Sequence, residues 1–270
     1  MRSGRGPKKS LGQHFLVDPS ARRRIVEALG ATRASEIVEI GPGEGALTEL
    51  LVGKVARVIA VELDNGLAAD LEARWGERDD FRLVHGDALD YQLATLVEGL
   101  EEFLVIGNLP YGITGPLFGR LLEPPRGKRV VVMVQAEVGE RILAPPGSKT
   151  YGALSVAVQA VFRVERVMKV PRGSFRPVPG VDSVVLALDR IDPPPLSVAE
   201  EGSLRQLVRA AFQWRRKQLG TILRRHSDLE SMRGRVELAL TATAIDPRAR
   251  PETLSSDDFL RLLRALQPRE

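Results

Sequence analysis

The sequence predicts an α/β fold in which a doubly wound, largely parallel sheet precedes a small C-terminal all-helical domain. From about residue 36 to 135, short runs rich in β-branched residues alternate with helical patterns, which is typical of βαβ units. A proline run then interrupts the chain at residues 193–195, and only helical periodicity follows it. These two observations predict two domains of different class.

The elements of the first domain follow in order. Asp18 and Pro19 are typical of an N-cap and a first helical residue, and Gly30 ends that helix. Five strands are then expected at Glu36–Ile40, Val58–Glu62, Phe81–His85, Phe103–Gly107 and Val130–Gln135. A helix over residues 153–160 leads to two more strands, which we expect to form an antiparallel edge, at Arg163–Val170 and Ser183–Asp189.

Three successive prolines after Asp192 lack backbone donors and have a restricted φ, so neither a strand nor a helix continues there. We place the boundary after residue 190, which gives a first domain of residues 1–190 and a second of residues 191–270. In the second domain, helical spacing is seen at Leu204, Leu207, Val208 and Ala211, and again near residues 235–243 and 256–266.

The composition excludes several classes of protein. No apolar run reaches the roughly 18 residues of a membrane span, and residues 1–10 lack the apolar stretch of a secretory signal. The absence of cysteine excludes disulfides and thiolate-ligated metals, and the spacing of His14, His85 and His226 does not suggest metal ligands. We expect a cytoplasmic monomer without a metal.

Positive charge is concentrated in two segments. Residues 1–30 carry seven Arg or Lys against two acids, and residues 205–235 carry nine against two, although the whole chain has a net charge of only +4. Such segments indicate a polyanionic partner contacted at defined places. Solvated helix faces are the alternative explanation for either segment.

A glycine-rich turn follows the first predicted strand. Gly41, Gly43 and Gly45 would let a ligand approach the backbone closely. Gly41, Gly43 and Ala46 also satisfy the relaxed dinucleotide fingerprint, with Glu62 about 20 residues later. The turn alone therefore leaves open a nucleotide-type cofactor, NAD, or a tight turn without a ligand.

Two carboxylates end consecutive predicted strands. Glu62 can accept both hydroxyl hydrogens of a ribose, and Asp87 can accept a hydrogen bond from an adenine amino group. Either acid could instead cap a helix or a turn. Their common position at the carboxyl edge of the sheet favours a ligand site.

The segment Gly107–Gly112 decides the chemistry. An adenine amino nitrogen is a poor nucleophile because its lone pair is delocalised into the ring, so acceptors aimed at its two hydrogens activate it. Asn108 offers a side-chain oxygen and Leu109 its carbonyl, Pro110 fixes the turn, and Tyr111 offers a ring on which an unstacked base can lie. An Asn-Pro turn with a packed tyrosine is the alternative.

Taken together, these motifs resemble the ribosomal RNA adenine dimethyltransferase family, in particular its small-subunit branch. Leu11–Leu16 is similar to the family's N-terminal motif, and Phe175–Ser183 to the segment whose phenylalanine helps to hold the target base. Phe212–Leu219 is similar to the family's Arg-Arg-Lys signature, with Gln218 where threonine is frequent, and Gly180 stands where lysine is common. The match runs nearly end to end.

The resemblance implies a Rossmann-like methyltransferase sheet that binds S-adenosylmethionine, and two methyl groups on each of two adjacent adenines near the 3′ end of small-subunit ribosomal RNA. The expected catalytic residues are Asn108, Leu109, Pro110, Tyr111 and Phe175, the last two as a clamp on the base. The expected cofactor contacts are His14, Leu16, Gly41, Gly43, Gly45, Glu62, Asp87 and Asn108.

RNA contacts are expected in the helical domain. The expected residues are Arg205, Arg209, Arg215, Arg216 and Lys217. Trp214 could add a stacking surface, although it and Phe212 are more typical of core residues.

Three alternatives remain open at this level. They are a large-subunit adenine methyltransferase of the macrolide-resistance type, an NAD-dependent dehydrogenase, and a ribosome-assembly factor whose binding matters more than its catalysis.

Overall fold

The computed structural model describes residues 13–267. The basic segment 2–9 and the start of the predicted motif Leu11–Leu16 therefore lie outside the described residues. Two compact units make up the chain. The first comprises the described residues up to Gly139 together with Val164–Arg190, and the second comprises Glu140–Arg163 and the described residues from Ile191 onward. In the described part of the chain, no helix is both long and apolar enough for a membrane span.

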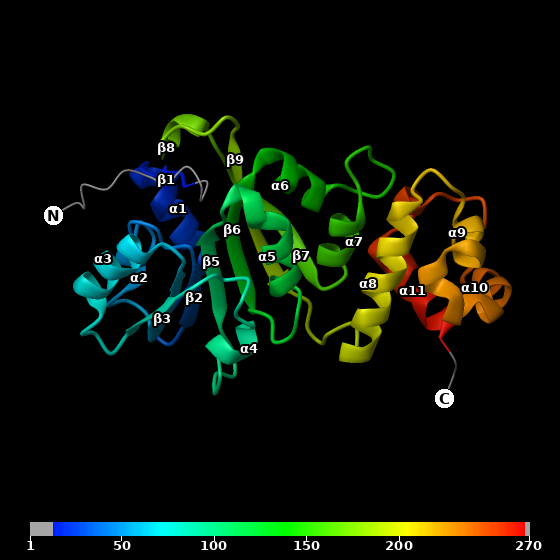
Figure 1. Ribbon diagram of the computed structural model, residues 1–270, viewed down its shortest axis with the longest axis horizontal. Coiled ribbons are helices and arrows are strands. Elements are labelled where there is room, and N and C mark those ends of the chain that lie inside the picture. Colours follow the sequence, from blue (N-terminus) through cyan, green and yellow to red (C-terminus); the bar gives the residue numbers. More distant parts are fainter. Residues whose placement is uncertain (1–12, 268–270) are drawn as a thin grey trace. The chain divides into compact units, whose positions relative to one another are not determined.

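A seven-stranded sheet forms the centre of the fold, in the order β4-β3-β2-β5-β6-β9-β7 (Figure 1). The parallel strands are β2 (Glu36–Ile40), β3 (Arg57–Glu62), β4 (Phe81–His85), β5 (Leu104–Asn108) and β6 (Arg129–Gln135). β9 (Ser183–Arg190) runs antiparallel to β6, and β7 (Phe162–Val170) follows at the edge. The predicted fold class is confirmed, including an antiparallel strand beyond the parallel core.

The central strands are apolar because helices cover a parallel sheet on both faces. Val38, Val105 and Val131 are fully buried, in strands that read as continuous β-branched runs. The helices that connect the strands are α1 (Pro19–Leu29), α2 (Thr48–Leu51), α3 (Asn65–Trp75), α4 (Leu93–Leu96), α5 (Thr114–Leu121) and α6 (Ala136–Leu143).

Helix α1 shows how the local sequence sets an element. Asp18 accepts hydrogen bonds from the backbone N–H groups of Ser20 and Ala21, and Gly30 ends the helix in the left-handed conformation at φ 66°. Its apolar stripe, which includes Ile25 and Leu29, is buried against β5 and β6.

A second, two-stranded sheet joins segments that are far apart in the sequence. β1 (Phe15–Leu16) pairs antiparallel with β8 (Phe175–Arg176), so the two strands lie side by side (Figure 1). The backbone N–H of Val17 donates to the carbonyl of Ser174 at 2.8 Å and continues this pairing. The N-terminal segment is thereby attached to the loop that precedes β9.

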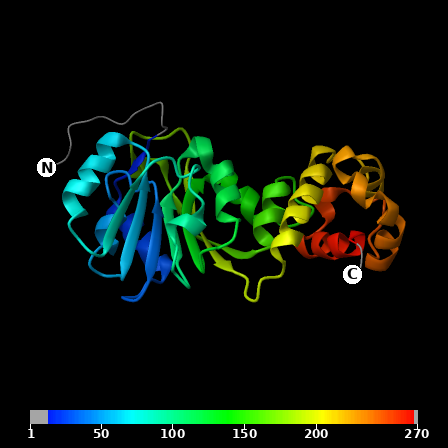
Figure 2. The ribbon, with the colours of Figure 1, turned by 60° about the horizontal axis from the view of Figure 1, so that its bottom comes forward.

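After β9 the described chain contains helices only (Figure 2). They are α8 (Val198–Gln213), α9 (Leu219–Arg225), η4 (Ser227–Arg235), α10 (Val236–Thr243), η5 (Pro251–Thr253) and α11 (Ser256–Leu266). The second unit also takes in α7 (Ala153–Gln159), which packs against α8 and α11. The domain boundary predicted from the sequence places this helix in the first domain.

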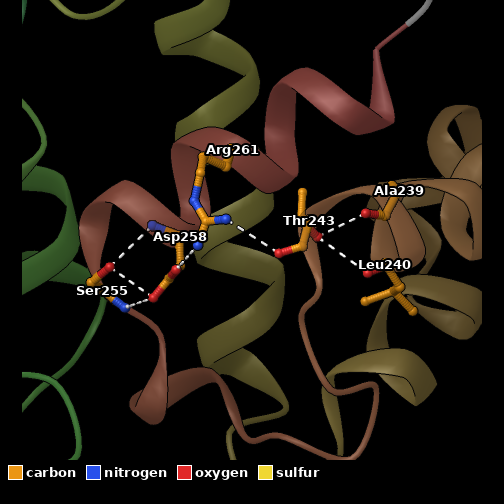
Figure 3. A network of polar contacts seen from close by, with 6 residues as sticks. All are labelled: Ala239, Leu240, Thr243, Ser255, Asp258 and Arg261. Atoms are coloured by element: carbon orange, nitrogen blue, oxygen red, sulfur yellow. Dashed lines mark hydrogen bonds and ion pairs between the residues drawn. The ribbon is translucent and has the colours of Figure 1, made fainter.

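Polar contacts close the helix ends of the second unit (Figure 3). Ser255 and Asp258 form a capping box at the start of α11, with the Ser255 N–H donating to Asp258 at 2.9 Å. From the next turn of α11, Arg261 donates to the carbonyl of Thr243 at 3.2 Å, at the end of α10. The Arg261 contact joins α11 to the end of α10, next to Ala244 with its φ of 54°.

Candidate active site

A cleft of about 470 Å³ lies at the carboxyl edge of the parallel strands. Open α/β sheets bind ligands at this edge because the strand-to-helix loops all emerge there. Segments following four of the strands contribute to it, together with the N-terminal segment. The lining residues are Gln13, His14, Phe15, Leu16, Glu39, Gly41, Pro42, Gly43, Glu44, Ala46, Leu47, Glu62, Leu63, Leu67, Asp87, Asn108, Leu109, Pro110, Tyr111, Gly112 and Ile113.

The glycine turn after β2 forms the floor of the cleft. Gly41 and Gly43 both have positive φ, of 66° and 60°. A Cβ at Gly43 would lie 3.2 Å from the Phe15 ring, so a side chain there would be crowded beneath the N-terminal segment as well as strained by the positive φ.

Gly45, which the sequence predicts as a cofactor contact, is not among the residues that line the cleft, and that contact stays a prediction. Its φ is 79°, and a Cβ there would lie 2.6 Å from the Trp75 ring. Glycine at position 45 therefore allows the positive φ of the turn and leaves room for Trp75 of α3.

Glu62, at the end of β3, is buried and connects two loops. One carboxylate oxygen accepts the N–H of Gly43 at 3.0 Å, and the other accepts the N–H of Asp64 at 2.9 Å. Burial raises the pKa of Glu62, and these two hydrogen bonds oppose the rise. Glu62 lines the cleft, and each of its carboxylate oxygens can accept a further hydrogen bond.

Asp87 follows β4 and is half-buried at the cleft. Its Oδ1 accepts the N–H of Leu89 at 2.9 Å, which orients the carboxylate. The Asp87 side chain thus closes a turn and also lines the cleft, and its contact with a ligand stays a prediction.

Glu39 lines the cleft, although the sequence motifs did not single it out. It is fully buried in β2, and the Thr48 hydroxyl donates to its Oε2 at 2.7 Å. Burial raises the pKa of Glu39 to about 7 against the opposing effect of Thr48. The signal was present in the sequence, because an acid in an otherwise apolar strand is costly unless it has a role.

Asn108 ends β5 with its side chain held in one orientation. Its Nδ2 donates to the carbonyl of His14 at 3.0 Å, which leaves Oδ1 as the acceptor, without a protein partner among residues 13–267. The N–H of the next residue, Leu109, donates to Met133 on β6 at 3.1 Å and fixes that peptide. Asn108, Leu109 and Pro110 all line the cleft.

Tyr111 begins the short helix η2 (Tyr111–Ile113) and is restrained at both ends of its side chain. Its hydroxyl lies 2.7 Å from the Ser183 Oγ, and its ring stacks on His14 with centroids 5.5 Å apart. Burial raises the pKa of Tyr111, so the phenol remains protonated at neutral pH. His14 in turn donates from Nδ1 to the carbonyl of Pro177 at 2.8 Å.

Phe175 lies in the interior of the structure, and its expected part in a clamp on the target base stays a prediction. The side chain is fully buried, belongs to the hydrophobic core with Leu16, and does not line the cleft. The reason is the β1–β8 pairing, which sets Phe175 opposite Leu16 and draws both into the core. Leu16 is also among the residues that line the cleft.

The predicted RNA-binding residues of the second unit differ in their surroundings. Arg215 donates to the Lys149 carbonyl at 3.0 Å and lies 3.7 Å from Glu252, and Arg205 lies 3.8 Å from Glu201. The other three predicted residues, Arg209, Arg216 and Lys217, are exposed and have no carboxylate partner among residues 13–267. Arg216 and Lys217 lie in the turn after α8, not on the helix.

Trp214 caps the end of α8 with 37% of its surface exposed, and its ring lies 4.9 Å from that of His226. Phe212 instead contacts Tyr151 and Phe259 as part of an aromatic cluster. Trp214 is therefore the more exposed of the two aromatic side chains, and a binding partner could contact it more easily.

Comparison with known proteins agrees with this geometry. A sequence model of the family described as "Ribosomal RNA adenine dimethylase" matches residues 5–267. Ribosomal RNA small subunit methyltransferase A of Moorella thermoacetica is 45% identical over 270 residues, which cover 97% of this chain and 93% of that protein. The protein of the same name from Geobacillus thermodenitrificans is 42% identical over 271 residues, covering 97% and 91%.

Solved structures give the same result. A dimethyladenosine transferase from Plasmodium falciparum superposes with a TM-score of 0.76 at 27% identity, covering 92% of this chain and 96% of that one. The 23S rRNA methyltransferase ErmE has a TM-score of 0.69 at 29% identity, covering 93% and 99%. The NAD-dependent dehydrogenase that the glycine turn left open is thereby set aside. The chain is an S-adenosylmethionine-dependent methyltransferase that belongs to the ribosomal RNA adenine dimethylase family.

Proposed function

We propose that the protein transfers two methyl groups to N6 of each of two adjacent adenines near the 3′ end of small-subunit ribosomal RNA. The proposal includes action as a monomer on assembling small subunits in the cytoplasm. It is supported by near full-length similarity to proteins named small subunit methyltransferase A. The single observation that carries the chemistry is the oriented Asn108 amide beside Tyr111 in the cleft.

The residues of the cleft fit S-adenosylmethionine. Gly41 and Gly43 leave room for a ligand against the backbone, Glu62 can accept the ribose hydroxyls, and Asp87 can accept the adenine amino group. His14 and Leu16 close the cleft from the N-terminal segment. When bound, the cofactor supplies a methyl group on a positively charged sulfur, which leaves as a neutral thioether.

The target adenine would be unstacked from the RNA and placed on the Tyr111 ring. Asn108 Oδ1 and the Leu109 carbonyl would accept its two amino hydrogens, which localises the nitrogen lone pair for an in-line displacement. Pro110 limits the freedom of the backbone between the two acceptors and the ring. The amine loses one proton for each methyl group it gains.

We also propose that the helical domain, residues 191–270, recognises RNA. Arg209, Arg216 and Lys217 are free to meet phosphates, and Trp214 is exposed beside them in the sequence. Arg205 and Arg215 would first have to leave the carboxylates they contact.

The test is methyl transfer from labelled S-adenosylmethionine to small ribosomal subunits that lack adenine dimethylation, with mass analysis of the nucleosides. Dimethyladenosine near the 3′ end is the expected product. Transfer only to large-subunit RNA would favour the resistance-type enzyme, to which the fold of ErmE is also similar. Tight binding to small subunits without transfer would favour an assembly factor.

A further inference from the structure

The Tyr111 hydroxyl makes a contact that stacking on a base does not require. It lies 2.7 Å from Ser183 Oγ, although the two residues are 72 positions apart in the chain. A phenylalanine ring would offer the same flat surface to a base. The hydroxyl therefore points to a role in the orientation of the ring.

Ser183 is a rigid anchor for that hydroxyl. It is the first residue of β9, is 1% exposed, and pairs with Gln135 of β6. The residue before it, Asp182, accepts the N–H of Ala136 at 3.0 Å through its carbonyl and the N–H of Arg172 at 2.9 Å through its side chain. Ser183 therefore has little freedom to move away from Tyr111.

His14 restrains the other part of the same side chain. Its ring lies against Tyr111 with planes 27° apart, and the Nδ1 bond to the Pro177 carbonyl holds the imidazole in place. The His14 carbonyl also accepts the Asn108 amide. One residue of the N-terminal segment thus contacts both the proposed hydrogen-bonding group and the proposed stacking ring.

We propose that Ser183 is a positioning residue for methyl transfer: its hydroxyl holds Tyr111 against His14, so that the ring is oriented before RNA binds. This inference rests on the proposed role of Tyr111 as the surface for the target base. A free tyrosine side chain would have to be ordered when the base arrives, and that entropy loss would weaken productive binding. The orienting hydrogen bond removes part of that loss in advance.

The test is a double-mutant cycle with Ser183→Ala, Tyr111→Phe and the double variant, assayed for methyl transfer to undermethylated small subunits. Each single variant is expected to lower kcat/KM for RNA by roughly 3- to 10-fold, the worth of one hydrogen bond. The double variant is expected to be no worse than either single, because all three lack the same bond. KM for S-adenosylmethionine should not change, since Ser183 does not line the cleft.

The matched control is Ser35→Ala, which removes a serine hydroxyl that lies 3.3 Å from Thr32 Oγ1 on the same unit and not in the cleft. It should leave all kinetic constants as in the parent protein. If Ser183→Ala fails to fold, Tyr111→Phe alone still tests the proposal. This variant removes the hydroxyl that bonds to Ser183 and keeps the aromatic ring.

The role of Ser183 would be overturned if the double variant lost kcat/KM for RNA by the product of the two single losses. It would also be overturned if Tyr111→Phe left the kinetics unchanged. A lowered Tm with unchanged kcat/KM for RNA would also overturn it, since that result describes a structural hydrogen bond. The parent protein separates this inference from the function itself. If it does not methylate small subunits, the proposed function fails before any variant is compared.

Discussion

At the scale of single residues, the cleft combines groups whose surroundings set their chemistry. Asn108 keeps a free acceptor because its amide N–H is already bound by His14. Glu39 and Glu62 are buried acids that are held by different donors, Thr48 in one case and the backbone N–H groups of Gly43 and Asp64 in the other. These differences lead to two predictions.

Asn108→Ala should lower turnover far more than cofactor affinity. Its acceptor matters most as the target nitrogen becomes pyramidal, so the loss falls on the transition state. We expect kcat to fall by roughly 100- to 1,000-fold, on the scale of losing one preorganised polar group. Single-turnover rates and calorimetric titration of S-adenosylmethionine measure the two quantities separately. An equal loss in both would assign Asn108 to cofactor binding.

Glu39→Gln should remove a pH dependence of stability. The folded pKa of about 7 lies above the ordinary value of 4.5, so the stabilisation from the protonated acid is present below pH 4.5 and is lost as the pH rises through 7. This loss corresponds to about 3 kcal/mol at most. Glutamine can still accept from Thr48 but does not titrate.

Urea unfolding of the two proteins at pH 5 and pH 8 checks this prediction. The free energy of unfolding should fall less between these pH values in Glu39→Gln than in the parent protein. Glu49→Gln, at an exposed position of α2, serves as the control and should behave like the parent. Parallel pH profiles for Glu39→Gln and the parent would contradict the raised pKa.

At the scale of elements, short segments place more of the side chains that distinguish this cleft than the long strands do. The two-residue strands β1 and β8 bring His14, which lines the cleft, next to the Pro177 carbonyl, while the long strands provide a rigid edge. In the second unit two of the exposed cations, Arg216 and Lys217, lie in the turn between α8 and α9, beside the exposed Trp214.

That turn leads to a prediction on RNA binding. Arg216→Ala with Lys217→Ala should weaken binding to small subunits and reduce the slope of log K against log salt by roughly 0.7 to 0.9 for each phosphate that the variant no longer neutralises. The control pair is Arg224→Ala with Arg225→Ala, in which Arg224 is already bound by Glu237 at 2.6 Å. Filter binding at several salt concentrations measures the slopes. Equal slopes in the test and control pairs would remove the turn from the interface.

At the scale of the whole molecule, the cleft lies within the first compact unit, so cofactor binding should stabilise that unit directly. S-adenosylmethionine at 100 times its Kd should add about 2.7 kcal/mol to the unfolding free energy. Gly43→Ala should lose most of this gain, because its Cβ would lie 3.2 Å from Phe15 at φ 60°.

Differential scanning calorimetry with and without the cofactor measures this gain. Gly53→Ala carries a similar backbone strain at φ 80° outside the cleft and should keep the full gain. A gain that survives in Gly43→Ala would move the cofactor away from the glycine turn.

The order of strands and helices, the capping of α1 and the place of Asn108 to Tyr111 in a cleft were readable from the sequence, because periodicity and turn residues are local properties. The family was readable for the same reason, since its motifs are short and fall in a fixed order. An antiparallel edge beyond the parallel core was also predictable, although β5 begins one residue later than predicted.

Only the tertiary structure decided which side chains meet. Strand pairing buries Phe175 opposite Leu16, α3 brings Trp75 against Gly45, and β9 delivers Ser183 to Tyr111. Each of these outcomes depends on residues at least 30 positions apart. Local patterns carry no information on such distances, because long-range pairing is set by the way the whole chain buries its apolar surface.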